Sequence, residues 1–276
     1  MITALRLFAK VLPGDHARAF VYLNLIYKPR SALRSMLNNF YRIDHVYSVI
    51  KEFTTTFRGP FSILEFGVAD GYSFAKNVFA THYLKASRDI VCHGFDTFEG
   101  MPETDDPRDR AGIKGSSWKA GQYRGDYEGL TRYLSDRYDN WRLHKGLFED
   151  SLTPELLEEL RVHKPILVWI DCDYYTSART VMERLIPILP SGAVIYLDEY
   201  EFNFGSRFTG EARLVNEINR GDFGADVELV LDKDLSWDLT RCYRFVRENP
   251  TIRFERMEAL GHVEDLRRRG NDSPLP

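Results

Sequence analysis

Blocks of apolar residues, separated by Gly, Pro and charged residues, divide the middle of the chain into short and long segments. The short blocks have the length of β-strands, and P-I-L-V-W-I at 165–170 is continuously apolar, as in a strand buried on both faces. Longer stretches carry apolar residues at helical spacing, most clearly over 176–189. This alternation predicts an α/β fold, a mostly parallel sheet with helices on both faces. The expected strands are residues 62–66, 90–95, 141–144, 165–170 and 193–197, followed by a closing antiparallel pair at 227–232 and 240–246.

The two ends of the chain differ from this alternating region. Residues 1–58 contain apolar clusters and stop at Gly59-Pro60, which predicts a helical N-terminal extension that serves as a lid or in oligomerisation. Residues 59–249 are expected to form the sheet domain, and 250–276 a C-terminal tail. A loop over 99–123 is long enough to be a lid or a binding loop.

Composition limits the classes of protein to which the chain can belong. Its 276 residues are 43% hydrophobic and 28% charged, the balance of a soluble globular protein, and a net charge of −4 gives no argument for nucleic-acid binding. No uncharged apolar run approaches the roughly 20 residues of a membrane span. The cysteines lack metal-ligand spacing and are expected to be reduced: Cys92, Cys172 and Cys242. We therefore expect a cytoplasmic protein with no nucleic-acid or membrane partner.

The sequence S-I-L-E-F-G-V-A-D-G-Y predicts the turn between the first strand and first helix of a Rossmann-like domain. Gly67 and Gly71 allow the backbone to approach a ligand closely because they have no Cβ. Ser73, after Tyr72, is expected to cap the helix. A dinucleotide-binding turn would have the sequence G-x-G-x-x-G and face phosphate. Here Glu65 replaces the first glycine, and its charge favours the ammonium group of S-adenosylmethionine. An ordinary glycine-containing turn is the alternative.

Acidic residues follow four of the predicted strands, at the same end of each. Ligands of open α/β sheets bind outside the carboxyl ends of the strands, so we expect these acids to face one crevice. Asp96, beside Thr97, is placed to accept hydrogen bonds from both ribose hydroxyls of an adenosine ligand, with loop capping as the alternative. Gly146, Phe148 and Glu149 follow the third strand and are expected to bound the adenine. The four acids are Glu65, Asp96, Asp171 and Asp198.

Further acids gather after the fourth and fifth strands, which are expected to be neighbours. Asp171 and Asp198 are followed by Asp173 and Glu199, and carboxylates this close repel one another unless a proton or a cation lies between them. Mg²⁺ prefers oxygen ligands, and it would lower the pKa of a bound substrate hydroxyl. Neither motif contains a histidine, so zinc is not expected. The alternative is that the acids cap helices or pair with basic residues, namely Arg179 and Arg213.

Five segments occur in order within residues 60–247: I-L-E-F-G-V-A-D-G-Y-S, G-F-D-T-F-E-G-M-P-E, K-G-L-F-E-D-S-L, W-I-D-C-D-Y-Y-T-S-A and I-Y-L-D-E-Y. Together they resemble the macrocin-type O-methyltransferases, class I enzymes that methylate sugars of antibiotics. The resemblance implies the class I methyltransferase fold with a seven-stranded sheet. It also implies that Mg²⁺ is held by Asp171, Asp198 and Glu199, with Asp171 as general base. The family has Asp where this chain has Glu199, an oxygen ligand one carbon longer.

These observations favour an S-adenosylmethionine-dependent and Mg²⁺-dependent O-methyltransferase. Its acceptor would be a hydroxyl of a small molecule, a sugar or a glycosylated natural product. Tyr174, Tyr175 and the loop over 202–208 would shape the acceptor site or serve as packing. Two alternatives are a nicotinamide-dependent oxidoreductase, which Glu65 disfavours, and a non-catalytic nucleoside-binding module. A homo-oligomer formed through the basic segment 1–43 is left open.

Overall fold

The computed structural model describes three long stretches of the chain and a few isolated residues near its start. Most of the predicted N-terminal extension and most of the predicted tail lie outside the described residues. Among the helices that are described, none is both long and apolar enough to cross a lipid bilayer. The described residues are 42–110, 118–237 and 240–257, with 7, 8, 11–13, 17 and 21.

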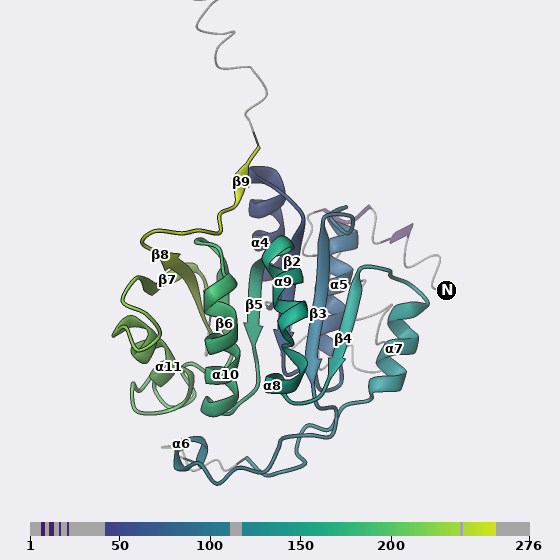
Figure 1. Ribbon diagram of the computed structural model, residues 1–276. Helices are drawn as coiled ribbons and strands as arrows, with labels where there is room; N and C mark the ends of the chain where they lie inside the picture. The colour runs from purple at the N-terminus through teal and green to yellow at the C-terminus, as the bar shows by residue number, and fades with distance from the viewer. Residues whose placement is uncertain are drawn as a thin grey trace, which may run out of the picture.

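A seven-stranded sheet in the order β4-β3-β2-β5-β6-β8-β7 forms the centre of the protein (Figure 1). The neighbouring strands β4, β3, β2, β5 and β6 are parallel to one another, and β8 runs antiparallel to its neighbours β6 and β7. The predicted sheet is therefore confirmed. The strand order changes direction between β2 and β5, which is where open α/β sheets bind their ligands. The strands are β2 Phe61–Phe66, β3 Ile90–Asp96, β4 Trp141–Lys145, β5 Lys164–Ile170, β6 Val194–Leu197, β7 Val227–Trp237 and β8 Thr240–Arg247.

Helices cover both faces of the sheet, as the apolar strands predict. Alternate residues of β2 belong to different cores: Ile63 packs with residues of α4 and α5, whereas Leu64 and Phe66 pack with residues of α9, α10 and α11. This follows from the two-residue period of side chains along a strand. The helices are α4 Arg42–Thr56, α5 Tyr72–Tyr83, α6 Pro107–Arg110, α7 Tyr127–Ser135, α8 Phe148–Ser151, α9 Pro154–Val162, α10 Tyr175–Leu185, the 3₁₀ helix Ile186–Ile188 and α11 Gly210–Asn219.

Some elements differ from the sequence-based expectation. The helix predicted over 176–189 ends at Leu185 and continues as a 3₁₀ helix, because Pro187 has no N–H with which to continue the α-helical ladder. Helices α8 and α11 were not predicted. α11 nevertheless buries Leu214 and Ile218 at helical spacing against the sheet.

The described part of the N-terminal segment packs on the same core as the sheet. Phe53 of α4 is 1% exposed, and its ring lies 4.7 Å from that of Phe254 and 6.2 Å from that of Phe61. Beside these rings, β1 (Phe57–Arg58) pairs antiparallel with β9 (Glu255–Arg256). The domain limits at residues 58 and 249 stay a prediction. The paired strands β1 and β9 lie near these limits.

We predict that Phe53→Ala lowers the free energy of unfolding by about 3–5 kcal/mol, because it removes a fully buried ring that α4 places against the sheet. Urea denaturation measures this change. Phe208→Ala is the control: its ring is 69% exposed, and we expect a change within about 0.5 kcal/mol. Equal effects of the two substitutions would contradict the packing described for α4.

Candidate active site

The turn after β2 requires a glycine at its first position. Gly67 has a φ of 94°, and a Cβ added there would lie 1.8 Å from the backbone oxygen of Asp171 at the end of β5. Its N–H donates to the carbonyl of Phe95 on β3, at 3.0 Å. The glycine therefore lets the β2 turn lie directly against the backbone that follows β5.

The start of α5 differs from the prediction. The helix begins at Tyr72, and its N-cap is Gly71, with a φ of 74° and no side-chain capping bond. The prediction that Ser73 caps this helix is wrong, because Ser73 already lies inside the first turn. Its hydroxyl instead donates to Oε1 of Glu65, at 2.6 Å.

Glu65 lies beneath the residues that line the cavity and is not itself exposed to the cavity. It is fully buried, and Asn77 donates to its Oε2 at 2.6 Å while Ser73 donates to its Oε1. Burial raises the pKa of Glu65 to about 8, although these two hydrogen bonds favour the charged form. The carboxyl group therefore positions Ser73 and Asn77, which do line the cavity, while Glu65 itself does not.

Asp96 joins two loops at the carboxyl edge of the sheet. Its Oδ2 accepts the backbone N–H of Ala69 at 2.8 Å, and its Oδ1 accepts that of Phe98 at 2.6 Å. Ala69 and Phe98 both have positive φ, 46° and 56°, so these bonds hold two tight turns. Asp96 therefore caps the two loops, as the alternative interpretation predicted. Asp96 also faces the cavity, where its oxygens keep further acceptor capacity.

A single cavity of about 550 Å³ collects most of the predicted site residues. This volume is in the range of small-molecule sites. Of the residues predicted to bind the cofactor, Glu65 and Gly71 do not line it. Those that do are Gly67, Tyr72, Ser73, Asp96, Thr97, Gly146, Phe148 and Glu149, together with Asp171 and Glu199 of the predicted metal site.

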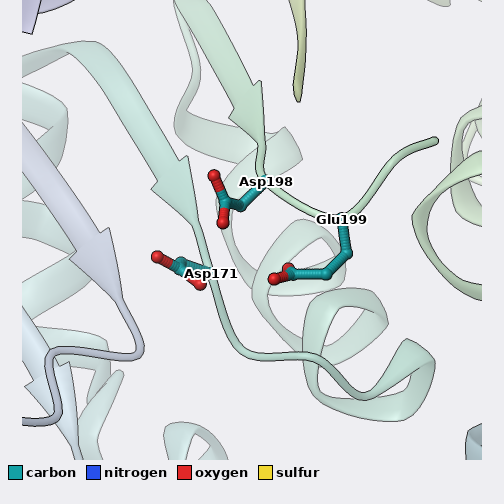
Figure 2. A group of neighbouring side chains, drawn as sticks. All are labelled: Asp171, Asp198 and Glu199. Carbon is teal, nitrogen blue, oxygen red and sulfur yellow. The ribbon is translucent and has the colours of Figure 1, made fainter. Parts of the chain in front are cut away.

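Three carboxylates meet at the ends of β5 and β6 (Figure 2). Asp171, Asp198 and Glu199 each offer an oxygen, and these oxygens all lie within 4.8 Å of one another. Burial, and then the charges of Asp171 and Asp198, raises the pKa of Glu199 well above its usual range. Oε2 of Glu199 is buried and has no hydrogen-bond partner among the described residues. An oxygen-only set of this kind is typical of sites for hard divalent cations.

The alternative in which these acids pair with Arg179 and Arg213 is wrong for the three carboxylates. Both guanidinium groups bind Glu217 on α11, at 2.9 Å and 2.7 Å. These two guanidinium groups therefore neutralise Glu217 and not the carboxylates at the ends of β5 and β6.

Two further acids border this group. Asp173, noted in the sequence, has a φ of 62°, and burial followed by the charge of Asp198 raises its pKa to about 7. Glu211, in the first turn of α11, was not predicted, and it is only 4% exposed. No pattern in the sequence indicates Glu211, because its position depends on how the connection between β6 and α11 folds back.

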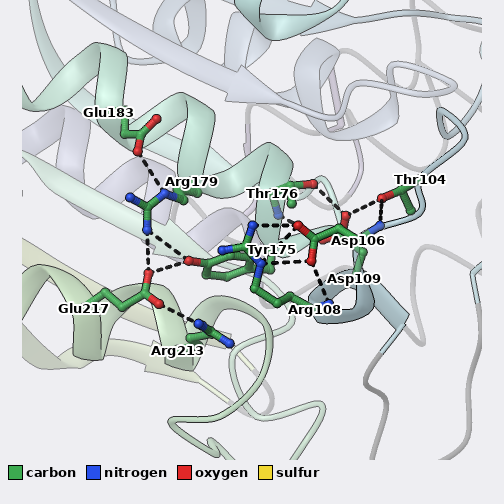
Figure 3. Close-up of polar contacts among 10 residues, drawn as sticks. All are labelled: Thr104, Asp106, Arg108, Asp109, Tyr175, Thr176, Arg179, Glu183, Arg213 and Glu217. Atoms are coloured by element: carbon green, nitrogen blue, oxygen red, sulfur yellow. Dashed lines mark hydrogen bonds and ion pairs between the residues drawn. The ribbon is translucent and has the colours of Figure 1, made fainter. Parts of the chain in front are cut away.

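The long loop after β3 is held over this edge by a polar network (Figure 3). Asp109 of α6 accepts the backbone N–H and the hydroxyl of Thr176 at the start of α10, at 2.9 Å and 2.7 Å. Thr104 donates to the same carboxylate at 2.8 Å. Gly100 to Thr104 line the cavity, so the anchored loop closes one side of it.

Aromatic residues near the cavity differ in their placement. Tyr175 is buried, and its hydroxyl donates to Glu217, so it serves as packing. Tyr174 lines the cavity, and its ring lies 6.5 Å from that of Trp118, which in turn lies 5.2 Å from that of Phe202. Trp118 was not predicted as a site residue.

Comparison with known proteins decides the family. The family model of macrocin O-methyltransferases (TylF) matches residues 28–226, which is more than half of the chain. The chain belongs to this family. The predicted resemblance and the assignment as an O-methyltransferase are thereby confirmed, and the family implies S-adenosylmethionine as the methyl donor.

Solved structures agree on the fold of this methyltransferase. The calicheamicin methyltransferase CalS11 has 19% identity and a TM-score of 0.58, covering 88% of this chain and 90% of that one. The O-methyltransferase NovP has 17% identity and a TM-score of 0.53, covering 75% and 80%. An apo structure of CalS11, described as a TDP-rhamnose 3'-O-methyltransferase, has 18% identity and a TM-score of 0.54, covering 88% and 92%. No curated protein sequence matches the chain.

We predict that Glu65→Gln stabilises the protein, and more so as the pH rises. A carboxyl whose pKa is raised from 4.5 to about 8 favours folding fully below pH 4.5 and loses this contribution as the pH rises through 8. The amide cannot ionise, so the gain over wild type should grow between pH 5 and pH 8 toward about 3–5 kcal/mol. Oδ1 of Asn77 has no hydrogen-bond partner among the described residues, and it can accept from the new amide nitrogen if the Asn77 amide turns.

Thermal and urea unfolding at several pH values measure this difference. Parallel stability curves of wild type and variant would show that Glu65 does not titrate with the raised pKa.

Proposed function

We propose that the protein transfers a methyl group from S-adenosylmethionine to a hydroxyl oxygen of a small molecule, with the help of Mg²⁺. One observation carries this proposal: a single cavity is lined by Gly67 of the β2 turn and Ser73 of α5, and also by two of the clustered acids, Asp171 and Glu199. A donor held at the turn would thus lie beside a hydroxyl held near the acids. Membership of an O-methyltransferase family supports the same reaction.

The residues present fit a divalent cation. Three carboxylate oxygens converge within 4.8 Å of one another, and Oε2 of Glu199 is buried without a hydrogen-bond partner among the described residues. Glu199 provides the oxygen that the family's Asp would provide, and it reaches the same group despite its longer side chain. Asp171, Asp198 and Glu199 would therefore hold Mg²⁺.

The proposed mechanism assigns each group a role. Mg²⁺, when bound, lowers the pKa of the acceptor hydroxyl, and S-adenosylmethionine supplies an electrophilic methyl group on a sulfonium. Asp171 takes the hydroxyl proton while the oxygen forms its bond to the methyl carbon. The C–S bond breaks in the same displacement, and S-adenosylhomocysteine is the other product. Asp96 would orient the ribose of the donor. The adenine would be bordered by Gly146, Phe148 and Glu149.

We propose a sugar, or a sugar on a natural product, as the acceptor. The family is named for macrocin, and one structural neighbour is described as acting on TDP-rhamnose. Tyr174 lines the cavity, and aromatic residues commonly provide the surfaces against which sugars pack. Neither the oxidoreductase nor the non-catalytic alternative is supported by the family membership. Incubation with labelled S-adenosylmethionine and a panel of sugar nucleotides and glycosides tests the acceptor class, and transfer only to non-sugar hydroxyls would contradict it.

We predict that Asp198→Asn weakens Mg²⁺ binding by about 10-fold or more and abolishes methyl transfer, because one of three ligands loses its charge. Affinity for S-adenosylhomocysteine should stay within about twofold, since Asp198 does not line the cavity. Calorimetric titrations with each ligand measure both effects without an acceptor.

Asp139→Asn is the control. This carboxylate is 94% exposed and precedes β4, at the opposite edge of the sheet. Its removal should change neither titration. If Asp198→Asn binds Mg²⁺ as tightly as wild type does, the metal role is refuted. If the wild-type protein does not bind S-adenosylhomocysteine, the donor assignment is refuted.

A further inference from the structure

Glu211 is a buried carboxylate without a hydrogen bond. It lies in the first turn of α11 and is 4% exposed, and neither of its side-chain oxygens has a hydrogen-bond partner among the described residues. Buried carboxylates normally pair with cations or accept several hydrogen bonds, because an unpaired one costs much free energy. The described residues therefore leave the acceptor oxygens of Glu211 without the partner that burial calls for.

The charged groups around Glu211 show which part of the protein it lies near. Burial, and then the charges of Asp198, Asp171 and Asp173, raises its pKa well above the usual range. The backbone N–H of Glu199 acts in the opposite direction, but it makes no hydrogen bond of normal geometry to Glu211. Glu211 thus lies next to the acids at the ends of β5 and β6.

Other oxygens on the same connection also lack partners. Thr209 is the N-cap residue of α11, yet its hydroxyl makes no capping bond and is buried without a partner. Oε2 of Glu199 is in the same condition. The segment from the end of β6 to the first turn of α11 therefore presents several acceptor oxygens that the described chain leaves unsatisfied. Such a set suits ordered water or a hydrated cation.

A second glutamate on α11 provides an internal comparison. Glu217 is 6% exposed, and Tyr175, Arg179 and Arg213 all donate to it. Burial alone would raise the pKa of Glu217, but the hydrogen bonds from Tyr175 and Arg213 outweigh it and lower the pKa. The same helix thus carries one buried glutamate with basic partners (Figure 3) and one without. Burial on α11 does not by itself leave a carboxylate unpaired.

We propose that Glu211 is a positioning residue of the cation site and accepts hydrogen bonds from water in the shell of an ion held by Asp171, Asp198 and Glu199. The inference rests on the proposed metal role. Glu211 is not among the residues whose oxygens lie mutually within 4.8 Å, so a water bridge fits better than direct ligation. Mg²⁺ keeps several of its waters in proteins, and each of them is a strong hydrogen-bond donor.

The test compares Glu211→Gln with Glu217→Gln in the full chain. Substituting a residue that hydrogen-bonds to the ligands around a metal typically lowers metal affinity by about 10–100-fold. We therefore expect calorimetry to show that Glu211→Gln weakens Mg²⁺ binding about 10-fold. Its melting temperature without Mg²⁺ should not fall, because the side chain has no hydrogen bond to lose. The rise in melting temperature on adding Mg²⁺ should shrink.

Glu217→Gln should behave in the opposite way. It weakens contacts to two arginines, so its melting temperature should fall while Mg²⁺ affinity stays within about twofold of wild type. Unchanged Mg²⁺ affinity in Glu211→Gln would overturn the inference and leave the metal role intact. Absence of Mg²⁺ binding in wild type would overturn both. The two failures are therefore distinguishable.

Discussion

Repulsion among the carboxylates at the ends of β5 and β6 is the interaction on which the site depends. Two like charges 4 Å apart repel by about 4 kcal/mol at the effective dielectric of a partly exposed site, and here three acids meet within 4.8 Å. The protein can relieve this repulsion by binding protons, as the raised pKa of Glu199 indicates, or by binding a divalent cation. Metal binding at such a site is coupled to proton release, because the ligands must be charged. Folding therefore creates a site that is stabilised by bound positive charge, whether protons or a cation.

Backbone geometry brings this site next to the turn after β2, the proposed binding site of the methyl donor. β2 and β5 are neighbouring parallel strands, so the turns that follow them leave the sheet at the same edge. Gly67 permits its turn to lie against the carbonyl of Asp171, where any side chain would collide. Gly67, which is proposed to contact the donor, is thus fixed against Asp171, which is proposed as general base. A reaction between two bound molecules requires this kind of fixed relation between their sites.

The sequence was sufficient to predict the strands and the meeting of Asp171 with Asp198 at the ends of β5 and β6, because apolar runs and strand direction determine both. The expectation that all four acids face one crevice is wrong for Glu65, which is fully buried within β2 and does not line the cavity. Side-chain partners could not be predicted in the same way. Ser73 has the residue type of a cap, but Gly71 takes that position and Ser73 binds Glu65. The pairing of β1 with β9 joins segments from opposite ends of the chain, and no local pattern specifies it. Glu211 enters the acidic group only through the path of the β6–α11 connection.

Three buried glutamates show why partners, more than burial, indicate a role. Glu217 meets two arginines and a tyrosine, so its charge is used within the protein to join α10 and α11. Glu65 meets only neutral donors, and burial raises its pKa to about 8, which suits a group that positions other side chains. Glu211 has no hydrogen-bonded partner among the described residues. The described residues therefore leave the cost of burying its charged form uncompensated, and either a bound proton or a bound ligand with hydrogen-bond donors or positive charge compensates it.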